Sequence, residues 1–520
     1  MFDVLIRGGI VYDGSGGPAA RADVGVTGGR IAEVGDLSAA RAEREIDAAG
    51  RHVLPGFVDA HVHGETAVHD PAVQLAALRQ GVTTFVLGQD GLSFAPAGPA
   101  TLRYVNRYFA AVNGRHPGDA PVTVAGLLAS YHRRTRLNTA YLVPHGTLRY
   151  EVMGPAERAP DAAELAAMER LLDRGLEEGA AGVSTGLEYA PGRYAQVPEL
   201  AALARRAAAR GLPYVTHMRG YETAAPAAMA EVREIALASG AAAHVSHYHG
   251  PADDLIADVD RLRGEGVDLT YDSYPYLRGC SILSMVTLPP WIPVADVDAA
   301  VAALADPAVR DRLDREWFAA RPEVWPRVTL SHVPSEEYAW AEGLAFPEAA
   351  ERAGMPPGRF CCELLVATEL EAGCVFGQPP TNSEESVRAL MRHEAHVGGS
   401  DGIYAGGHPH PRGWGAFARY LRRHVVELGD WTWERAAVHL ASRTADRFGL
   451  SDRGRVRRGA AADLVVLDPA AIADAATYEN PREPAIGVDH VLVNGEVVLT
   501  GGALAAALPG EALTPSGSRP

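Results

Sequence analysis

The sequence contains no lysine, and all 48 of its basic residues are arginine. This absence excludes enzymes that form a Schiff base on a lysine, and nucleotide-binding proteins that hold phosphate with a Walker-type lysine. It also excludes a carboxylated lysine as the bridge between two metal ions. These three mechanisms are therefore ruled out for this chain.

Other common features are absent as well. The four cysteines, Cys280, Cys361, Cys362 and Cys374, form no CxxC pair, so a disulfide framework is not expected in so long a chain. No uninterrupted apolar run reaches the roughly 18–20 residues that would span a bilayer. The residues after Met1 lack the basic and apolar regions of a secretory signal. We therefore expect a soluble cytoplasmic protein.

The two ends of the chain show the alternating apolar and polar pattern of short strands. Gly28-Gly29 marks a hairpin turn near the N-terminus, and Asn494-Gly495 marks another near the C-terminus. Because neither end can form a core alone, we predict one small sheet domain built from residues 1–55 and 450–505. Residues 506–520 are expected to form a C-terminal tail whose last stretch, TPSGSRP, is loose.

Between these ends, residues 56–449 alternate apolar strands with amphipathic helices. Strands such as PVTVAGLL and VDLTYDSY are separated by stretches such as VPELAALARRAAARG, which ends at glycine. This alternation predicts a parallel sheet with helical crossovers. We favour a (β/α)8 TIM barrel of the α/β class, with site residues at the C-terminal ends of its strands.

A doubly wound sheet is the second choice. It is less favoured because no GxGxxG motif follows the first strand of a βαβ unit.

One stretch interrupts the alternation of strands and helices. Residues 285–350 are rich in Trp and Pro, and we expect them to form an insertion over one face of the barrel.

Polar residues follow several of the expected strands. In GFVDAHVHGE, His61 and His63 stand one residue apart and therefore point to the same side of a strand. His217 closes LPYVTHM, His247 closes AAHVSHY, and Asp401 follows EAHVGGSDG. Convergent imidazoles and carboxylates are what Zn²⁺ or a similar ion requires. The alternatives are a solvated strand edge for the first pair, satisfied core histidines for the next two, and a helix N-cap for Asp401.

These residues lie in stretches that resemble a known superfamily. LPGFVDAHVH and GSDG resemble the amidohydrolases, and a finer resemblance is to the D-aminoacylases (N-acyl-D-amino-acid deacylases). It rests on segments spread over essentially the whole chain: GVTTFVLGQDGLSFAP, LVPHGTLR, GAAGVSTGLEYAPGRYA, HPHPRGWGAFARYL and RTADRFGLSDRGRVRRGAAADLVVLDPAAIADAATYENP. The resemblance implies a (β/α)8 barrel beside a small β-sandwich, and hydrolysis of N-acyl-D-amino acids to a carboxylic acid and a D-amino acid.

The resemblance also implies roles for the polar residues. His61 and His63 would face one metal position, His217 and His247 would hold the tightly bound zinc, and Asp401 would be the catalytic acid/base. D-aminoacylases have a cysteine ligand in a pattern like G-N-C-G, where this chain has Asp90.

We expect Asp90 to be a bridging or terminal ligand; its alternative role is to stabilise the turn that follows. The expected cofactor is Zn²⁺, one or two ions per chain. An oxygen ligand in place of a thiolate lets Mn²⁺ or Co²⁺ compete better. Such an ion lowers the pKa of a bound water and polarises the carbonyl, while Asp401 transfers the proton.

A substrate of this kind carries an α-carboxylate that must be held. By resemblance, Arg412 in HPHPRGWG lies in the segment that binds it, and an arginine fork suits a carboxylate. Tyr189 is a second contact, and His249 stands where many family members have a lysine. Arg219 is either a further contact or a surface arginine.

The expected partner is therefore a small N-acyl amino acid. The net charge of -17 argues against nucleic acid or an anionic membrane, and the sequence leaves the number of subunits open. Two other functions remain. A hydantoinase-like or isoaspartyl-dipeptidase-like hydrolase would use the same residues on a cyclic amide or a dipeptide. A non-catalytic barrel would act as a scaffold, with no need for four histidines beside Asp401.

Overall fold

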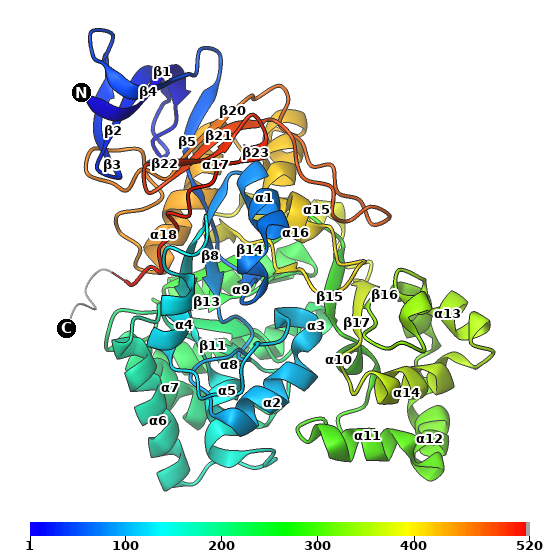
Figure 1. The fold of residues 1–520 in the computed structure, drawn as a ribbon. Coiled ribbons are helices and arrows are strands. Elements are labelled where there is room, and N and C mark those ends of the chain that lie inside the picture. Colours follow the sequence, from blue (N-terminus) through cyan, green and yellow to red (C-terminus); the bar gives the residue numbers. More distant parts are fainter. Residues whose placement is uncertain (516–520) are drawn as a thin grey trace.

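The computed structural model describes residues 1–515, and residues 516–520, the end of the stretch TPSGSRP, lie outside this described part. Nine strands from both ends of the chain form one sheet, at the top of Figure 1. Strand β20 pairs antiparallel with β5, so the two ends of the chain meet at the centre of the sheet. The strands are β1 (Phe2–Val11), β2 (Ala20–Thr27), β3 (Arg30–Gly35), β4 (Ala42–Asp47), β5 (His52–Pro55), β20 (Leu464–Leu467), β21 (Val488–Val493), β22 (Glu496–Thr500) and β23 (Ala503–Leu504).

Both predicted hairpins are confirmed within this terminal sheet. Gly28 and Gly29 have φ angles of 58° and 77° and join β2 to β3, while Asn494 and Gly495, at 48° and 81°, join β21 to β22. These left-handed angles are the ones that glycine and asparagine tolerate. The limits of a separate domain, residues 1–55 with 450–505, stay a prediction.

Parallel strands form a closed barrel below the terminal sheet. They are β6 (Phe57–Asp59), β8 (Val82–Leu87), β9 (Asn138–Tyr141) continued by β10 (Val143–Pro144), β11 (Val183–Gly186), β12 (Tyr214–His217), β13 (Ala243–Val245), β14 (Leu269–Ser273) and β18 (His396–Gly398). Each pairs parallel with the next. The backbone N–H of Ala60 donates to Gly398 O at 3.1 Å and closes the ring. The predicted (β/α)8 barrel is therefore confirmed, and the doubly wound sheet is wrong.

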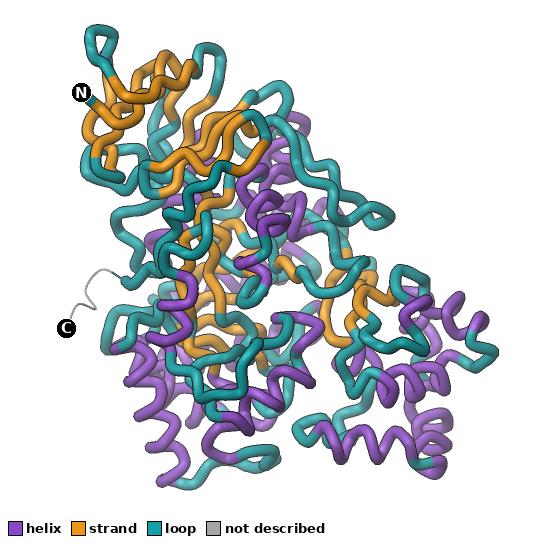
Figure 2. The backbone as a smooth tube through the Cα atoms, in the orientation of Figure 1, coloured by secondary structure: helices purple, strands orange, loops and turns teal. Residues whose placement is uncertain are grey.

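Helices cover the outside of the barrel, as the ribbon and the tube both show (Figures 1 and 2). Residues close in sequence determine where these helices begin. In α6 the side chain of Asp161 accepts from the backbone of Glu164, whose side chain accepts in turn from the Asp161 N–H. The main outer helices are α1 (Pro71–Arg79), α4 (Val124–Tyr131), α5 (His145–Met153), α6 (Ala162–Glu177), α7 (Val197–Ala208), α8 (Ala225–Ser239), α9 (Ala252–Gly264), α15 (Glu384–Arg392), α16 (Arg412–Arg419) and α18 (Arg443–Arg447). Two further helices, α2 (Pro99–Tyr108) and α3 (Ala110–Asn113), follow β8.

A separate block lies between β14 and α15, at the right of Figures 1 and 2. We call residues 278–377 the inserted segment; the range predicted for an insertion, 285–350, lies within it. Phe346, Phe360 and Leu365 are fully buried in an apolar core that the segment shares with helices α2 and α3. It contains a three-stranded antiparallel sheet and five α-helices: β15 (Arg278–Ile282), β16 (Val328–His332), β17 (Gly373–Gly377), α10 (Leu283–Thr287), α11 (Val297–Ala305), α12 (Pro307–Leu313), α13 (Phe346–Arg352) and α14 (Pro357–Ala367).

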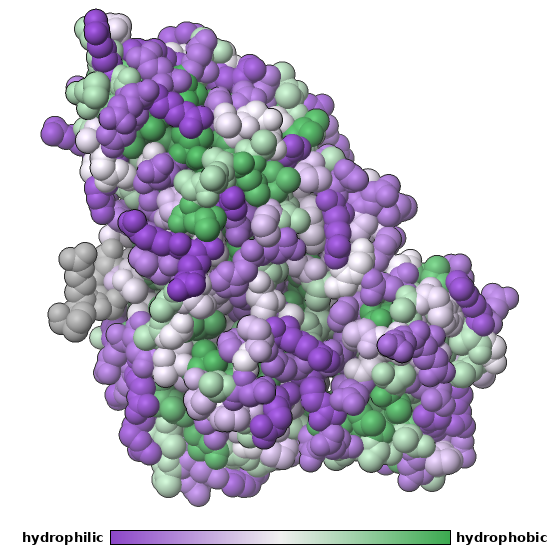
Figure 3. All heavy atoms as spheres, viewed as in Figure 1, coloured by the Kyte–Doolittle hydropathy of each residue, from purple (hydrophilic) through white to green (hydrophobic). Residues whose placement is uncertain are grey.

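The described part of the tail is not loose. Leu513 N donates to Thr139 O at 2.7 Å, and Glu511 N donates to the Asn138 side chain at 3.0 Å, so the tail runs along β9. These residues precede the stretch TPSGSRP that was predicted to be loose; most of that stretch lies outside the described residues, so its looseness stays a prediction. Within residues 1–515, no helix combines the length and apolarity needed to cross a membrane. Figure 3 shows apolar residues gathered over the terminal sheet and the inserted segment, with polar residues around them.

Candidate metal-dependent hydrolytic site

Six polar residues from different strands meet at the C-terminal end of the barrel. His61 and His63 follow β6, Asp90 follows β8, His217 ends β12, His247 lies two residues after β13, and Asp401 lies three residues after β18. All six are at most 6% exposed. We call them the central cluster. The structure thus brings together every residue for which the sequence suggested metal binding or proton transfer.

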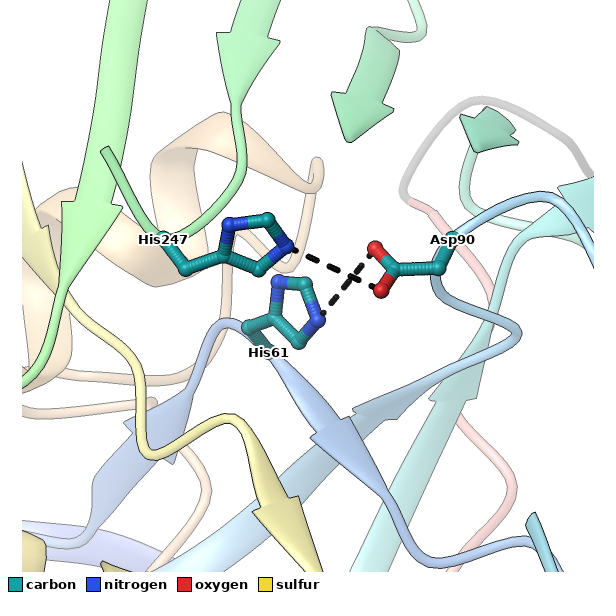
Figure 4. A group of neighbouring side chains, drawn as sticks. All are labelled: His61, Asp90 and His247. Carbon is teal, nitrogen blue, oxygen red and sulfur yellow. Dashed lines mark ion pairs between the residues drawn. The ribbon is translucent and has the colours of Figure 1, made fainter. Parts of the chain in front are cut away.

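Asp90 lies at the middle of the central cluster. Its Oδ1 is 3.5 Å from His61 Nε2, and its Oδ2 is 3.6 Å from His63 Nε2 and 3.4 Å from His217 Nδ1. The same Oδ2 is 3.7 Å from His247 Nε2. Figure 4 shows the rings of His61 and His247 directed at this carboxylate. A single carboxylate therefore faces four imidazole nitrogens.

Backbone strain accompanies this arrangement. Asp90, His247 and Asp401 have φ angles of 54°, 37° and 50°, in the left-handed region that residues other than glycine rarely adopt. Such conformations cost about 1–3 kcal/mol each and persist where surrounding contacts hold them. Three strained residues in one cluster indicate that the backbone there is shaped for side-chain placement.

Further polar groups contact three of the imidazole rings on the side that points away from Asp90 and hold their orientation. Asn113 Oδ1 contacts His63 Nδ1 at 2.9 Å, and Glu188 Oε2 contacts His217 Nε2 at 2.8 Å. Asp272 Oδ2 lies 3.5 Å from His61 Nδ1. Each contact engages the ring nitrogen that points away from Asp90 and leaves the other nitrogen for the cluster. This is how outer groups orient metal-ligating histidines.

The central cluster has the charge balance of a cation site. Burial would lower the pKa of His217, but Asp90 and Glu188 raise it to about 10. Burial would raise the pKa of Asp90, but His61 and His217 hold it well below its usual range. The cluster therefore favours positive charge at the imidazoles of His61 and His217, and a divalent ion supplies this charge in place of protons.

Unpartnered ligand atoms point to the same conclusion. Among the described residues, Oδ1 of Asp90 and Nδ1 of His217 are buried without a hydrogen-bond partner. Two groups have ligand atoms close enough to hold one ion: His61, Asp90 and His247, and His61, His63 and Asp401. Imidazole with carboxylate suits Zn²⁺, and oxygen ligands also admit harder ions such as Mn²⁺.

Asp401 connects the central cluster to an arginine. Its Oδ1 is 3.6 Å from Nε2 of both His61 and His63, and its Oδ2 is 2.8 Å from Arg412 Nη2. Arg412 is fully buried, and its guanidinium lies 4.6 Å from the centre of the Tyr274 ring. Its Nε and Nη1 have no hydrogen-bond partner among residues 1–515.

Two of the substrate contacts suggested by the sequence line the cavity that opens above the central cluster, whereas Arg412 and Arg219 do not. Tyr189 and His249 line it; Tyr189 Oη is 2.8 Å from Ser281 Oγ, and His249 stacks on Tyr221. Arg219 does not line the cavity. It pairs with Glu231 at 3.1 Å and donates to two backbone carbonyls, so its role is structural.

A serine nucleophile is not formed here. Residues 182–186, GVSTG, match the GxSxG pattern of serine hydrolases. However, Ser184 Oγ donates to Gly88 O and accepts from Gly91 N at 3.2 Å, so it braces the loop that carries Asp90. The motif is therefore structural in this chain.

The cavity above the central cluster has a volume of 440 Å³. Barrel residues form its floor, and the inserted segment forms much of its wall. The size suits a small molecule.

Some residues that shape the site were not predicted from the sequence, although two of them carried a recognisable signal. Glu188 and Asp272 are carboxylates at strand ends, as Asp90 is, in GLEYAPG and VDLTYDSY; Asn113 and the wall arginines Arg321 and Arg327 carried none.

Asp272 gives the first prediction. Its Oδ1 accepts from the His247 N–H at 2.9 Å, and its Oδ2 contacts His244 Nε2 at 3.0 Å and His61. We expect Asp272→Asn to weaken binding of a divalent ion by about 10–100-fold, because two cluster histidines lose their charged anchor. Competition with a chromogenic chelator measures this. Asp268→Asn, just before the same strand and paired with Arg447 at the surface, is the control. Equal affinity in both variants would contradict the prediction.

Comparison with known proteins was consistent with this geometry. A model of the amidohydrolase family matches residues 44–499. N-acyl-D-glutamate deacylase of Alcaligenes xylosoxydans xylosoxydans is 38% identical, over 95% of this chain and 93% of that protein. D-aminoacylase of the same organism is 32% identical, over 96% and 94%. The crystal structure of N-acyl-D-glutamate deacylase from Bordetella bronchiseptica, complexed with zinc and a phosphonate mimic of the tetrahedral intermediate, superposes with a TM-score of 0.82 at 33% identity, covering 99% of both chains.

Proposed function

This chain belongs to the amidohydrolase family, and from that premise we propose that it hydrolyses the amide bond of N-acyl-D-amino acids to a carboxylic acid and a free D-amino acid. One observation supports this most: Asp401 lies between two imidazoles of the central cluster and a buried arginine with free donors, beside a cavity. The D-configuration is inferred from the relatives, which are named for D-amino-acid substrates.

The enzyme is metal-dependent, and its residues fit the metal. His217, His247 and Asp90 would hold one divalent ion, most simply zinc, while His61 and His63 complete that site or hold a second ion. When bound, the ion acts as a Lewis acid on the scissile carbonyl and lowers the pKa of water. Mn²⁺ or Co²⁺ competes with Zn²⁺ here because Asp90 offers an oxygen.

Asp401 is the group that moves the proton. One carboxylate oxygen faces the imidazoles of His61 and His63, where the reaction takes place, and the other is held by Arg412. As a general base, Asp401 accepts the proton of the attacking water at Oδ1. As a general acid, it then delivers that proton to the departing nitrogen. The contact with Arg412 fixes the direction of the carboxylate.

Arg412 would also bind the α-carboxylate of the substrate. Nη2 is engaged by Asp401, but Nε and Nη1 are unpartnered among the described residues, and buried donors of this kind are costly unless a ligand accepts from them. Arg412 itself does not line the cavity, whereas Tyr274 and Cys280, which contact it, do. Tyr189 and His249 complete the wall near the substrate.

Arg412→Ala tests this assignment. We expect kcat/KM on an N-acyl-D-amino acid to fall by about 10–200-fold, the effect of losing a hydrogen bond to a charged group. Arg412→Lys should rescue only part of it, because an ammonium lacks the planar fork. The matched substrate is the amino-acid amide, which has no carboxylate. If Arg412 binds the carboxylate, the acid loses more than the amide; if it only positions Asp401, both lose the same factor.

The alternatives predict different substrates. A hydantoinase-like or dipeptidase-like enzyme would prefer a cyclic amide or a dipeptide, and a scaffold would hydrolyse neither. Assay of N-acetyl-D-amino acids against their L-forms, hydantoins and dipeptides separates these functions, and a preference for the L-form would contradict the proposal. The expected cytoplasmic location stays a prediction.

A further inference from the structure

The long connection between β20 and β21 reaches from the terminal sheet to the segment that leads into α16. We call residues 468–487 the connecting loop. Its Asp474 pairs with Arg419 of α16 at 3.1 Å, and the backbone carbonyl of its Tyr478 accepts from His408 Nε2 at 2.8 Å. Figure 1 shows this stretch, orange to red, beside α16. The terminal sheet is therefore tied to the part of the chain that contains HPHPRGWG.

Tyr478 extends this contact into the interior of the molecule. Its ring packs edge-on against the ring of His410, with the centroids 5.1 Å apart, and its Oη is 3.3 Å from His410 Nε2. The guanidinium of Arg278, at the start of β15, lies 4.2 Å from the centre of the same tyrosine ring. Since these contacts come from two different elements, they fix Tyr478 in place against His410.

His410 is fully buried and holds one orientation. Its Nδ1 accepts from the Arg412 N–H at 3.0 Å, so the ring proton lies on Nε2, which faces the carbonyl oxygen of Arg278 at 3.1 Å. A charged ring would direct a second N–H at the N–H of Arg412. Burial and the charge of Arg412 hold the pKa of His410 well below its usual range. The ring is therefore neutral, with its acceptor toward Arg412 and its donor toward Arg278 and Tyr478.

The contact between His410 and Arg412 determines where α16 begins. The N–H of Arg412 is the first of the helix, and the N-cap residue, Pro411, has no side chain that accepts a hydrogen bond, so His410 supplies the acceptor. Arg412 in turn holds Oδ2 of Asp401 at 2.8 Å, and the strained backbone of Asp401, with φ 50°, depends on such support. Direct contacts therefore run without a break from the connecting loop to this carboxylate.

We propose that His410 and Tyr478 are positioning residues of the active site, and that the terminal sheet acts through them on the direction of the Asp401 carboxylate. This inference rests on the proposed function, in which Asp401 transfers the proton. Neither positioning residue lines the cavity, so their effect on the reaction passes through Arg412. A displacement of about 1 Å at a reacting group can lower a rate by about 100-fold, so contacts outside the cavity still affect turnover.

Two substitutions of His410 separate its acceptor from its donor. Asparagine carries an oxygen on Cγ, where histidine carries Nδ1, and can still accept from the Arg412 N–H. Glutamine places its amide near the position of Nε2 and leaves that N–H without an acceptor. We expect His410→Gln to lower kcat by about 10–100-fold and His410→Asn to stay within about threefold of the unmodified enzyme. Steady-state kinetics on N-acetyl-D-amino acids measure both values.

Tyr478→Phe removes the hydroxyl and keeps the ring. We expect kcat to fall by about three- to tenfold, the effect of losing one hydrogen bond between neutral groups. Because the packing of the ring is kept, this variant tests the proposal even where His410→Gln does not fold. Tyr338→Phe is the matched control, because Tyr338 packs on Phe360 of the inserted segment and does not line the cavity.

The same substitutions in the Asp401→Asn enzyme show whether the effect passes through Asp401. A residue that acts by directing this carboxylate loses its effect on kcat once the carboxylate is gone. A residue that only supports the fold lowers kcat by the same factor in both backgrounds. We expect His410→Gln and Tyr478→Phe each to change kcat of the Asp401→Asn enzyme by less than about twofold.

The outcomes separate this inference from the proposed function. Equal factors in both backgrounds, or equal losses in His410→Asn and His410→Gln, would overturn the positioning role and leave the deacylase function intact. Unchanged turnover in His410→Gln would do the same. Hydrolysis of a hydantoin or a dipeptide, but of no N-acyl-D-amino acid, would contradict the proposed substrate, and the same variants would then test the positioning role on the substrate that is hydrolysed. A protein that hydrolyses none of these compounds would contradict both.

Discussion

Asp401→Asn is expected to lower kcat by about 10²–10⁴-fold on any substrate that the unmodified enzyme hydrolyses, the usual scale for loss of a general acid–base group. The substitution keeps the size of the side chain and removes its basicity. Asparagine also tolerates the left-handed backbone, φ 50°, that Asp401 adopts. The loss should therefore fall on proton transfer rather than on the shape of the loop.

Two further measurements make this result specific. Metal content should change little, because His217, His247 and Asp90 hold their places without Asp401. Thermal unfolding should show some loss of stability, because Arg412 is fully buried and would lose the one acidic partner that it has within residues 1–515. Turnover near the unmodified value would show that the proton is carried by another group, and a loss of metal in proportion to activity would show that Asp401 acts as a ligand.

Much of the fold could be predicted from the sequence because the relevant signals are local. Gly28-Gly29 and Asn494-Gly495 mark hairpins through backbone angles that few other residues adopt, and the alternation of strands and helices marks a parallel sheet. The tail could not be predicted in the same way. Leu513 and its neighbours carry little pattern of their own, and they are ordered only because the edge of β9 accepts their backbone groups.

The central cluster was predictable for a similar reason, whereas its surroundings were not. A histidine or aspartate at the end of a parallel strand faces the same end of the barrel as all the others. Arg412 shows how far the sequence alone could predict the site. Sequence places it near Asp401, but only the structure shows that it bonds to that carboxylate. Arg321 and Arg327 are two arginines among 48, and their position at the cavity depends on how the inserted segment packs.

Asp90→Asn is expected to remove bound metal and to lower activity by about 10³-fold or more, since the ion supplies several kcal/mol of charge stabilisation. The carboxylate of Asp90 lies 3.4 Å from His217 and 3.7 Å from His247. A neutral amide cannot balance a divalent charge there, although it keeps the size and the backbone preference of the residue. Metal analysis of purified protein and activity after dialysis with a chelator measure both effects.

Asp90→Cys is the matched variant, because a thiolate is a strong ligand for Zn²⁺ and a poor one for Mn²⁺. We expect this variant to keep zinc and to retain activity within about tenfold, while activation by Mn²⁺ falls further than in the unmodified enzyme. The pair of variants separates charge and ligation from shape, since both side chains are close in size to aspartate. If Asp90→Asn kept its metal and its turnover, Asp90 would serve only the turn at Gly91, and the ion would have to be held by the histidines and Asp401 alone. If Asp90→Cys lost zinc as completely as Asp90→Asn, two carboxylate oxygens would be needed at this position, which is the expected requirement of an aspartate that bridges two ions.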